Sequence, residues 1–184
     1  ATRPRSYREL PLKLAEYGHV HRHELSGVLH GLMRVRAFTQ DDAHVYCMPN
    51  QIEEQVVTMI KMIYTMLNKF GFSDIDVTIS TKPENALGSQ EYWDNATNAL
   101  KGALDKMNLK YSISEGEAAI YGPKIEYRIK ESMDREWQCG TIQVDFFFPQ
   151  NFDLEYVAST GQRERPVMIH QANYGSLERF FAII

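Results

Sequence analysis

The chain has 184 residues, of which 43% are apolar and 24% are charged, and its formal net charge at pH 7 is −4. This length suits one domain with a substantial core, and the composition is that of an ordinary soluble globular protein. No apolar run reaches the roughly 18 residues of a membrane helix, and the first residues lack the apolar core of a signal peptide. The acidic balance excludes a general attraction to nucleic acid, so any RNA contact would be local. We therefore expect a cytoplasmic protein without membrane contact.

The two ends and the two cysteines add to this expectation. Cys47 and Cys139 do not form a Cys-x-x-Cys pair, which favours a reducing compartment. The last five residues, 180–184, are those of the middle of a buried helix. We therefore interpret the chain as part of a longer protein.

The first half predicts a strand pair followed by a helix. Residues 9–47 alternate between apolar stretches and a long polar loop, which is typical of two joined strands. Apolar residues then recur every three or four positions over 51–70, where Asn50 is the predicted N-cap and Gly71 the end.

The second half predicts further strands around one helix. Residues 74–80 alternate as a half-buried strand, and Ser89 caps a predicted helix over 90–107. We expect a final helix after Gly175-Ser176 and more strands at 111–113, 125–129, 142–148 and 167–170. This order disfavours regular βαβ units and predicts an α+β fold, an antiparallel sheet with helices packed on one face, as a single domain over residues 1–184.

Several motifs that would name a chemistry are absent. The sequence has no P-loop, no GxGxxG after a strand, no HExxH and no GxSxG.

Polar residues at strand spacing mark one candidate site. Gln40, Asp42 and His44 lie two residues apart, so they face the same side of a strand. They suit either a site floor or the solvent face of an edge strand, and the pattern alone does not decide. His44 and Cys47 form an H-x-x-C, which is a weak zinc signal because structural sites need four ligands. His170 is a second candidate, and a single histidine is more often a hydrogen-bonded structural residue.

Arginines supply the candidate phosphate ligands. Arg22 and Arg179 are the strongest, because a guanidinium binds phosphate with two parallel hydrogen bonds. The alternative is a surface salt bridge, which contributes less than about 1 kcal/mol.

Five blocks of sequence together resemble a known family. They are Gly18 to Gly27 with its Arg22-His23-Glu24, Leu29 to His44, Tyr121 to Glu126, Gln138 to Phe146, and His170 to Phe180. In order and spacing these blocks resemble the class II aminoacyl-tRNA synthetases, and within them the threonyl-tRNA synthetase family. The resemblance covers nearly the whole chain, with departures at His23, Gln171 and Asn173.

The resemblance implies a class II catalytic core between the second and third signature motifs. The first motif, the editing domain and the anticodon-binding domain would lie outside this chain, and the full-length enzyme would be a homodimer. It also implies that threonine and ATP react to threonyl-adenylate, followed by transfer of threonine to the acceptor end of tRNA(Thr).

The same resemblance assigns residues to the reaction. Arg22, Lys124 and Arg179 would be catalytic, and the ATP-binding set would be Arg22, Glu24, Arg34, Gln138, Thr141, Ser176 and Arg179. Threonine would be bound by Gln40, Asp42, Tyr121 and Gln143. Mg²⁺ would accompany ATP, and His44 and His170 would be two of three protein ligands of Zn²⁺, the third being a cysteine upstream of the chain. Cys47 does not match that cysteine.

Two other functions remain open from the sequence. One is a catalytically silent synthetase-like module that binds RNA or a partner. The other is a related ligase for serine or proline.

Overall fold

A seven-stranded sheet organises the computed structural model of the chain, which describes residues 3–184. The strand order is β2-β3-β10-β7-β6-β4-β5, and all neighbours are antiparallel except β4 and β5. The strands are β2 (Leu12–His21), β3 (Ala37–Cys47), β4 (Ile75–Ser80), β5 (Ser112–Ser114), β6 (Lys124–Lys130), β7 (Glu136–Asp145) and β10 (Val167–Ala172). The predicted antiparallel α+β fold is confirmed, with one parallel pair that the sequence did not reveal.

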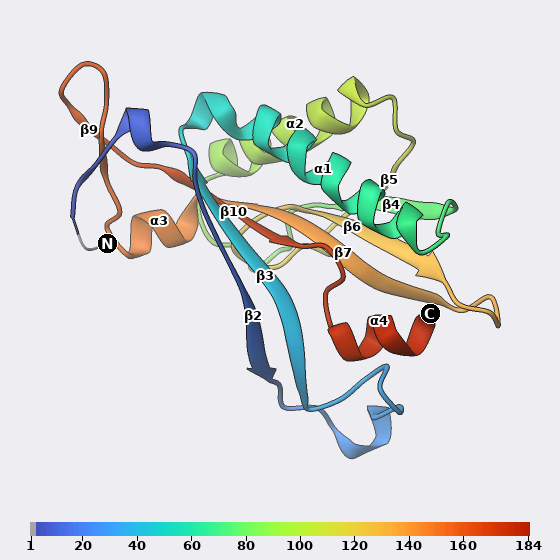
Figure 1. Ribbon diagram of the computed structural model, residues 1–184. Helices are drawn as coiled ribbons and strands as arrows, with labels where there is room; N and C mark the ends of the chain where they lie inside the picture. Colours follow the sequence, from blue (N-terminus) through green and yellow to red (C-terminus); the bar gives the residue numbers. More distant parts are fainter. Residues whose placement is uncertain (1–2) are drawn as a thin grey trace.

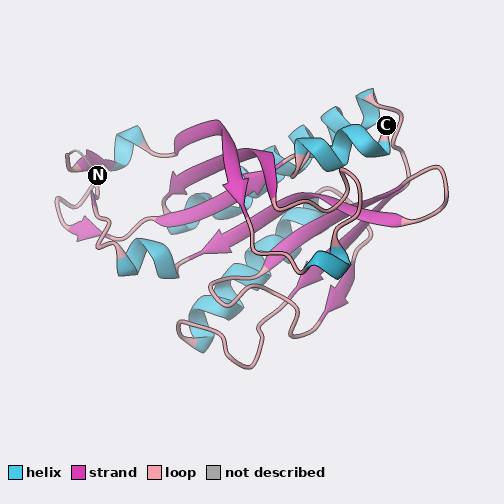
Figure 2. Ribbon diagram, turned by 90° about the horizontal axis from the view of Figure 1, so that it is seen from below, coloured by secondary structure: helices cyan, strands magenta, loops and turns pink. Residues whose placement is uncertain are grey.

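Helices α1 (Ile52–Lys69) and α2 (Gln90–Lys106) lie side by side over one face of this sheet (Figure 1). Figure 2 looks from below and shows the strands in front of these two helices. The remaining elements are α3 (Phe147–Asn151), α4 (Leu177–Ile183), and a small sheet of β1 (Arg5–Ser6), β8 (Tyr156–Val157) and β9 (Arg163–Glu164). Single 3-10 turns span Tyr7–Glu9, Ser26–Val28 and Pro49–Gln51.

The core lies between the two long helices and the sheet. Because strand side chains alternate between faces, Ile125 and Tyr127 of β6 and Ile142 of β7 point toward the helices. They pack with Ile63 of α1 and Leu100 of α2, and all five are fully buried. The alternate residues of the same strands are therefore left on the opposite face.

Most predicted elements are confirmed, and local interactions set where several of them begin or end. Ser89 caps α2, since its Oγ accepts a hydrogen bond from the N–H of Tyr92 at 3.2 Å. Gly71 follows α1 with φ +86°, which favours glycine. The predicted cap at Asn50 is wrong, because Asn50 lies inside a 3-10 turn that leads directly into α1.

The predicted strand over 142–148 is also too long. It ends at Asp145, whose Oδ1 accepts hydrogen bonds from the N–H groups of Phe147 and Phe148 at 2.7 and 2.9 Å. These bonds begin α3, so the apolar alternation that continues past Asp145 does not belong to the sheet.

The last helix is only partly buried, contrary to the expectation for residues 180–184. Phe180 packs against Phe70 and Phe72 beyond the end of α1, but Phe181 is 67% exposed. None of the helices in the described part of the chain has the length and apolarity to cross a membrane.

Candidate active site

The strand register brings polar side chains from distant parts of the sequence into one row. His44 of β3 lies opposite His170 of β10, and His170 lies opposite Gln143 of β7. Gln143 in turn lies opposite Lys124 of β6, and Lys124 lies opposite Ser80 of β4. Residues directly opposite each other share a face, so this row runs across the sheet on the face away from α1 and α2.

A pocket of about 550 Å³ lies on this face. Gln40, Asp42 and His44 all line this pocket. Every residue that the sequence assigned to the site lines it: Arg22, Glu24, Arg34, Gln40, Asp42, His44, Tyr121, Lys124, Gln138, Thr141, Gln143, His170, Ser176 and Arg179. The fold therefore assembles one site from residues up to 157 positions apart (22 to 179).

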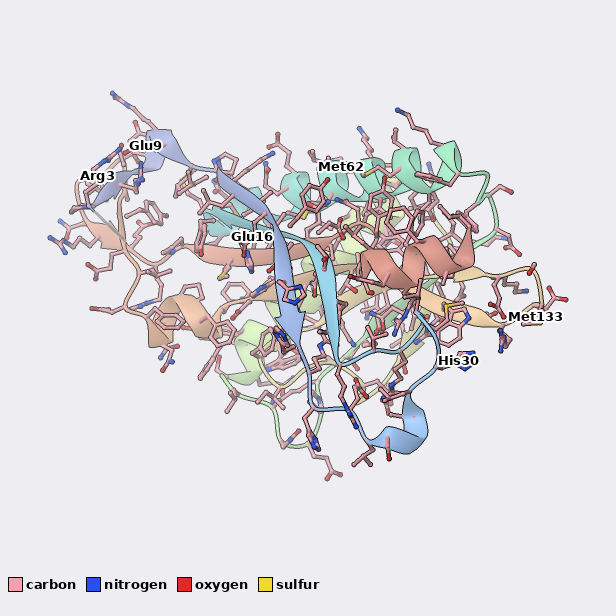
Figure 3. All side chains as sticks on the ribbon, turned by 60° about the horizontal axis from the view of Figure 1, so that its bottom comes forward. Arg3, Glu9, Glu16, His30, Met62 and Met133 are labelled. Atoms are coloured by element: carbon pink, nitrogen blue, oxygen red, sulfur yellow. The ribbon has the colours of Figure 1, made fainter. Side chains whose placement is uncertain are left out.

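The loop over 22–36 carries arginines and a carboxylate at one end of the pocket. The guanidinium of Arg22 lies 5.1 Å from the ring centroid of Phe38, and Arg34 Nε is 3.0 Å from Glu24 Oε2. His30, labelled in Figure 3, stacks in parallel with Trp137 at a centroid distance of 6.3 Å. These contacts hold the loop against the sheet without occupying Arg22 in an ion pair within the described residues.

Arg179 reaches the same end from α4. Its Nε donates to the carbonyl of Met33 at 2.8 Å and its Nη1 to the carbonyl of Gln138 at 3.1 Å. Burial lowers the pKa of Arg179, and the nearby positive charges of Arg22 and Arg34 act in the same direction. A site that gathers guanidinium groups whose charges repel one another is suited to a polyanionic ligand.

Asp41 and Glu178 fix the chain that carries Arg179, a role that no local sequence pattern indicated. Asp41 accepts hydrogen bonds from the backbone N–H groups of Asn173, Tyr174 and Gly175, the first and last at 2.7 and 2.9 Å. Burial raises the pKa of Asp41, and these backbone hydrogen bonds act against the rise. The carboxylate of Glu178 accepts from the N–H of Thr39 at 2.9 Å.

Gly175 allows this turn to approach the sheet. Its φ is +73°, and a Cβ there would lie 2.6 Å from the carbonyl oxygen of Cys139. Only glycine fits both constraints. Ser176 follows it and caps α4, since its Oγ accepts from the N–H of Arg179 at 3.2 Å.

Two histidines and Asp42 line the other end of the pocket, and the buried Asp145 contacts one of the histidines. The rings of His44 and His170 are perpendicular, with centroids 4.8 Å apart. His170 Nε2 lies 2.9 Å from Oδ2 of the fully buried Asp145, and His44 Nε2 lies 3.8 Å from Asp42 Oδ1. Burial lowers the pKa of His44, while the charge of Asp42 opposes this. Imidazoles that lie beside carboxylates in this way are suitable metal ligands.

The zinc site predicted from the sequence would need a further protein ligand beside these two histidines. Among residues 3–184 no group of three or more His, Cys, Asp or Glu residues is arranged to hold a metal ion. Cys47 cannot add a ligand beside His44, because it faces the helices and is fully buried in the core.

Between the two ends, uncharged polar groups and one lysine line the floor. Gln143 Nε2 donates to the carbonyl of Gly122 at 2.8 Å, and Gln138 Nε2 donates to Thr141 Oγ1 at 2.9 Å. A Cβ at Gly122 would lie 1.9 Å from the carbonyl oxygen of Val144, so glycine alone fits beside β7. Lys124 Nζ lies 2.8 Å from Glu126 Oε1.

Some pocket residues were not singled out from the sequence. They are mostly apolar or small: Met33, Val35, Phe38, Ala119, Cys139, Ala172 and Gly175. Their residue types match those of the core, so no sequence signal separates them from it. Gln171, which departs from the family pattern, also lines the pocket and donates to Asn173 Oδ1 at 2.7 Å. Two of the three departures, Gln171 and Asn173, thus contact each other.

Comparison with known proteins shows the family of the chain. The family described as tRNA synthetase class II core domain (G, H, P, S and T) matches residues 2–184. The threonine–tRNA ligase of Campylobacter lari is 58% identical over 98% of the chain, and that of Nautilia profundicola is 56% identical over the same share. The chain spans about 30% of the length of these relatives.

A solved structure gives the same result for the fold. The crystal structure of the RNA binding domain of threonyl-tRNA synthetase from Cryptosporidium parvum superposes with a TM-score of 0.92 at 45% identity, covering 97% of this chain and 45% of the other. Likeness over nearly every residue confirms the resemblance that the five sequence blocks predicted. The chain therefore belongs to the family of class II tRNA synthetase core domains, and its relatives within that family are threonine–tRNA ligases.

Proposed function

We propose that the chain is the core of a threonine–tRNA ligase. It would join threonine to ATP, giving threonyl-adenylate and pyrophosphate, and then transfer threonine to the acceptor end of tRNA(Thr). The observation that carries the proposal is one pocket with arginines at one end and the Asp42, His44 and His170 side chains at the other. This arrangement suits a polyphosphate at the first end and a small amino acid with a hydroxyl group at the second.

The chemistry of activation fits these residues because it needs positioning more than proton transfer. The carboxylate of threonine is already a nucleophile, and it attacks the α-phosphorus of ATP while pyrophosphate leaves. Catalysis then depends on in-line placement and on neutralising phosphate charge. We assign the α-phosphate and the threonine carboxylate to Arg22, the γ-phosphate to Arg179, and a further ATP contact to Arg34. Lys124 would lie near the reacting carboxylate, and Mg²⁺ would bind with the phosphates.

The remaining ATP contacts would fix the nucleoside and the helix that carries Arg179. Glu24 would seat the adenine, while Gln138 and Thr141 would lie along the nucleotide. Ser176 would act at the start of α4, where its hydroxyl already bonds the N–H of Arg179. Arg179 must leave the carbonyls of Met33 and Gln138, or share its five N–H groups with them, when phosphate binds.

Selection of threonine over valine requires recognition of the hydroxyl group. An apolar pocket separates such nearly isosteric pairs by only about 10²-fold. Asp42 would accept the hydroxyl hydrogen bond, and Gln40, Tyr121 and Gln143 would line the pocket around it. We propose His44 and His170 as Zn²⁺ ligands, because two adjacent imidazoles, one oriented by a carboxylate, suit this metal. When bound, Zn²⁺ would supply a Lewis acid for the amino and hydroxyl groups of threonine.

The relatives' names support the wider partners of this function. The curated relatives are threonine–tRNA ligases, and the Cryptosporidium structure is named an RNA binding domain. We propose tRNA(Thr) as the second substrate of this chain, a cytoplasmic location, and a homodimer for the full-length enzyme. The first signature motif and the other domains would lie outside residues 1–184.

Threonine-dependent exchange between ATP and labelled pyrophosphate tests the proposal. Exchange is measured on the 184-residue chain and on the protein extended to the length of its relatives, each with and without zinc. We expect zinc-dependent exchange that is selective for threonine over valine and serine, and loss of both zinc and exchange in His44→Ala. Faster activation of serine or proline would assign the chain to another ligase. A folded, zinc-loaded, extended protein without exchange would indicate a silent binding module.

A further inference from the structure

Glu126 is a buried carboxylate for which the proposed reaction has no use. It lies in the middle of β6, between β4 and β7, and is only 5% exposed. It does not line the pocket, although its neighbours Lys124 and Thr141 do. A buried charge is costly unless it is paired and hydrogen-bonded, so its presence requires an explanation.

Both oxygens of Glu126 have partners, and the partners differ. Oε1 lies 2.8 Å from Lys124 Nζ, and Oε2 accepts a hydrogen bond from Ser80 Oγ at 2.7 Å. Arg128 Nη2 lies 3.7 Å from Oε2. Ser80 is fully buried and lies opposite Lys124 in the register. The carboxylate is therefore held at one oxygen by the sheet and presents the other oxygen to the lysine.

The same contacts fix the position of the lysine ammonium. Lys124 and Glu126 are two residues apart on a strand, so both side chains stand on the open face of the sheet. The Lys124 side chain is 20% exposed and reaches the pocket, whereas that of Glu126 is 6% exposed behind it. A lysine has a flexible four-carbon stem and loses its orientation when nothing holds its end.

The cations of the pocket are thus held in two ways. Arg179 is held by backbone carbonyls and Arg22 by an aromatic ring, so both keep an unpaired positive charge for phosphate. Lys124 is paired with a carboxylate, so part of its charge is already neutralised. Its contribution then depends on where its N–H groups point rather than on net charge.

We propose that Glu126, anchored by Ser80, is a positioning residue that aims the Lys124 ammonium at the reacting carboxylate. This inference rests on the proposed function, because it assigns Glu126 a part in threonine activation. An ion pair that only stabilised the sheet would not need to place its cation in the pocket. Apolar residues of similar volume stabilise a buried position as well or better.

A double-mutant cycle in pyrophosphate exchange tests the role. The variants are Glu126→Gln, Lys124→Ala and the double variant, made in the protein extended to the length of its relatives. Glu126→Gln keeps the shape and an acceptor for Ser80 but removes the charge. We expect it to lower the exchange rate by roughly 10- to 100-fold, as misplacement of a catalytic group does. In the Lys124→Ala background the same change should have no further effect beyond about 2-fold, because Glu126 acts through the lysine.

Two further variants separate positioning from stability. Ser80→Ala removes one hydrogen bond and keeps the ion pair. We therefore expect it to lower the exchange rate by less than Glu126→Gln does. Asp76→Asn removes a carboxylate that is 3.9 Å from Arg128 and outside the pocket, so exchange should be unchanged. Thermal unfolding of every variant shows that the protein remains folded at the assay temperature.

NMR of lysines bearing ¹³C-methyl groups gives a readout that needs no activity. We expect the Lys124 signal to shift and narrow in Glu126→Gln and to stay in place in Asp76→Asn. An unchanged Lys124 signal, or an equal loss of exchange in both lysine backgrounds, would overturn the inference. Absence of exchange in the parent protein would instead overturn the proposed function, and the NMR comparison would then still decide whether Glu126 orders Lys124.

Discussion

The two faces of the central strands carry different kinds of side chain, although residues of the two faces alternate along each strand. On β6 and β7, Ile125, Tyr127 and Ile142 are fully buried against α1 and α2. Their neighbours Lys124 and Gln143 face the pocket. One face holds the fold together and the other carries the candidate chemistry, so adjacent substitutions should affect different properties. A shift of the register by one residue would exchange the two faces, which is why a buried face specifies the register strongly.

Removing an unpaired cation from the open face should give the largest effect on the exchange reaction. We expect Arg22→Ala to lower threonine-dependent pyrophosphate exchange by about 10³-fold or more, because arginines that neutralise phosphate charge in the transition state contribute on this scale. The free energy of unfolding should change by less than about 1 kcal/mol, since Arg22 is exposed. Arg8→Ala, a surface arginine that contacts Tyr7, is the control. Equal effects of the two changes would contradict the assignment.

A cavity on the helix face should show the opposite behaviour. Ile142→Ala is expected to lower the free energy of unfolding by about 2–5 kcal/mol, because it removes fully buried methylene groups from the core. Thr141→Ala, one residue earlier and on the open face, should cost less than about 1 kcal/mol but slow the exchange reaction. Denaturant unfolding and exchange, measured on the same two samples, compare the faces directly. Similar stability losses in both variants would contradict the proposed difference between the two faces.

Loss of the cap of α4 should have a smaller effect on both stability and activity. Ser176→Ala removes the hydroxyl that accepts from the N–H of Arg179, and loss of such a cap costs about 1 kcal/mol. Because the same turn positions Arg179, the KM for ATP should rise in the folded protein. Ser176→Asp keeps an acceptor at the cap and should restore the stability. Stability that stays low in Ser176→Asp would show that capping is not the reason.

Cys47 and Cys139 should be equally unreactive, although Cys139 lines the pocket. Burial raises the pKa of Cys47 and of Cys139 to about 12, from the ordinary value of 9.0. At pH 8 neither thiol should react with a disulfide reagent until the protein unfolds. Between about pH 9 and 12 the folded state holds more protons than the unfolded state, so stability should fall as pH rises through this range. Fast reaction of the native protein at pH 8 would show that the pocket exposes Cys139.

Local patterns predicted most of the elements and failed where a side chain redirected the backbone. The capping serine of α2 and the glycine after α1 are local signals, and both were predicted correctly. The end of β7 was missed, since Phe146 and Phe148 continue the apolar alternation past Asp145. The carboxylate of Asp145 begins α3 there, and its second oxygen contacts His170, which is distant in the sequence.

The sequence by itself determined the alternation of the strands, the apolar faces of the two long helices and the blocks that resemble the synthetase family. It also placed Gln40, Asp42 and His44 on one face, because side-chain direction on a strand follows from spacing alone. The tertiary structure decided which strands lie next to each other and so aligned His44, His170, Gln143 and Lys124 in one row. It also decided that Asp41 holds the chain before α4 and that Ser80 of β4 anchors Glu126 of β6, since contacts between different strands depend on register and packing rather than on local pattern.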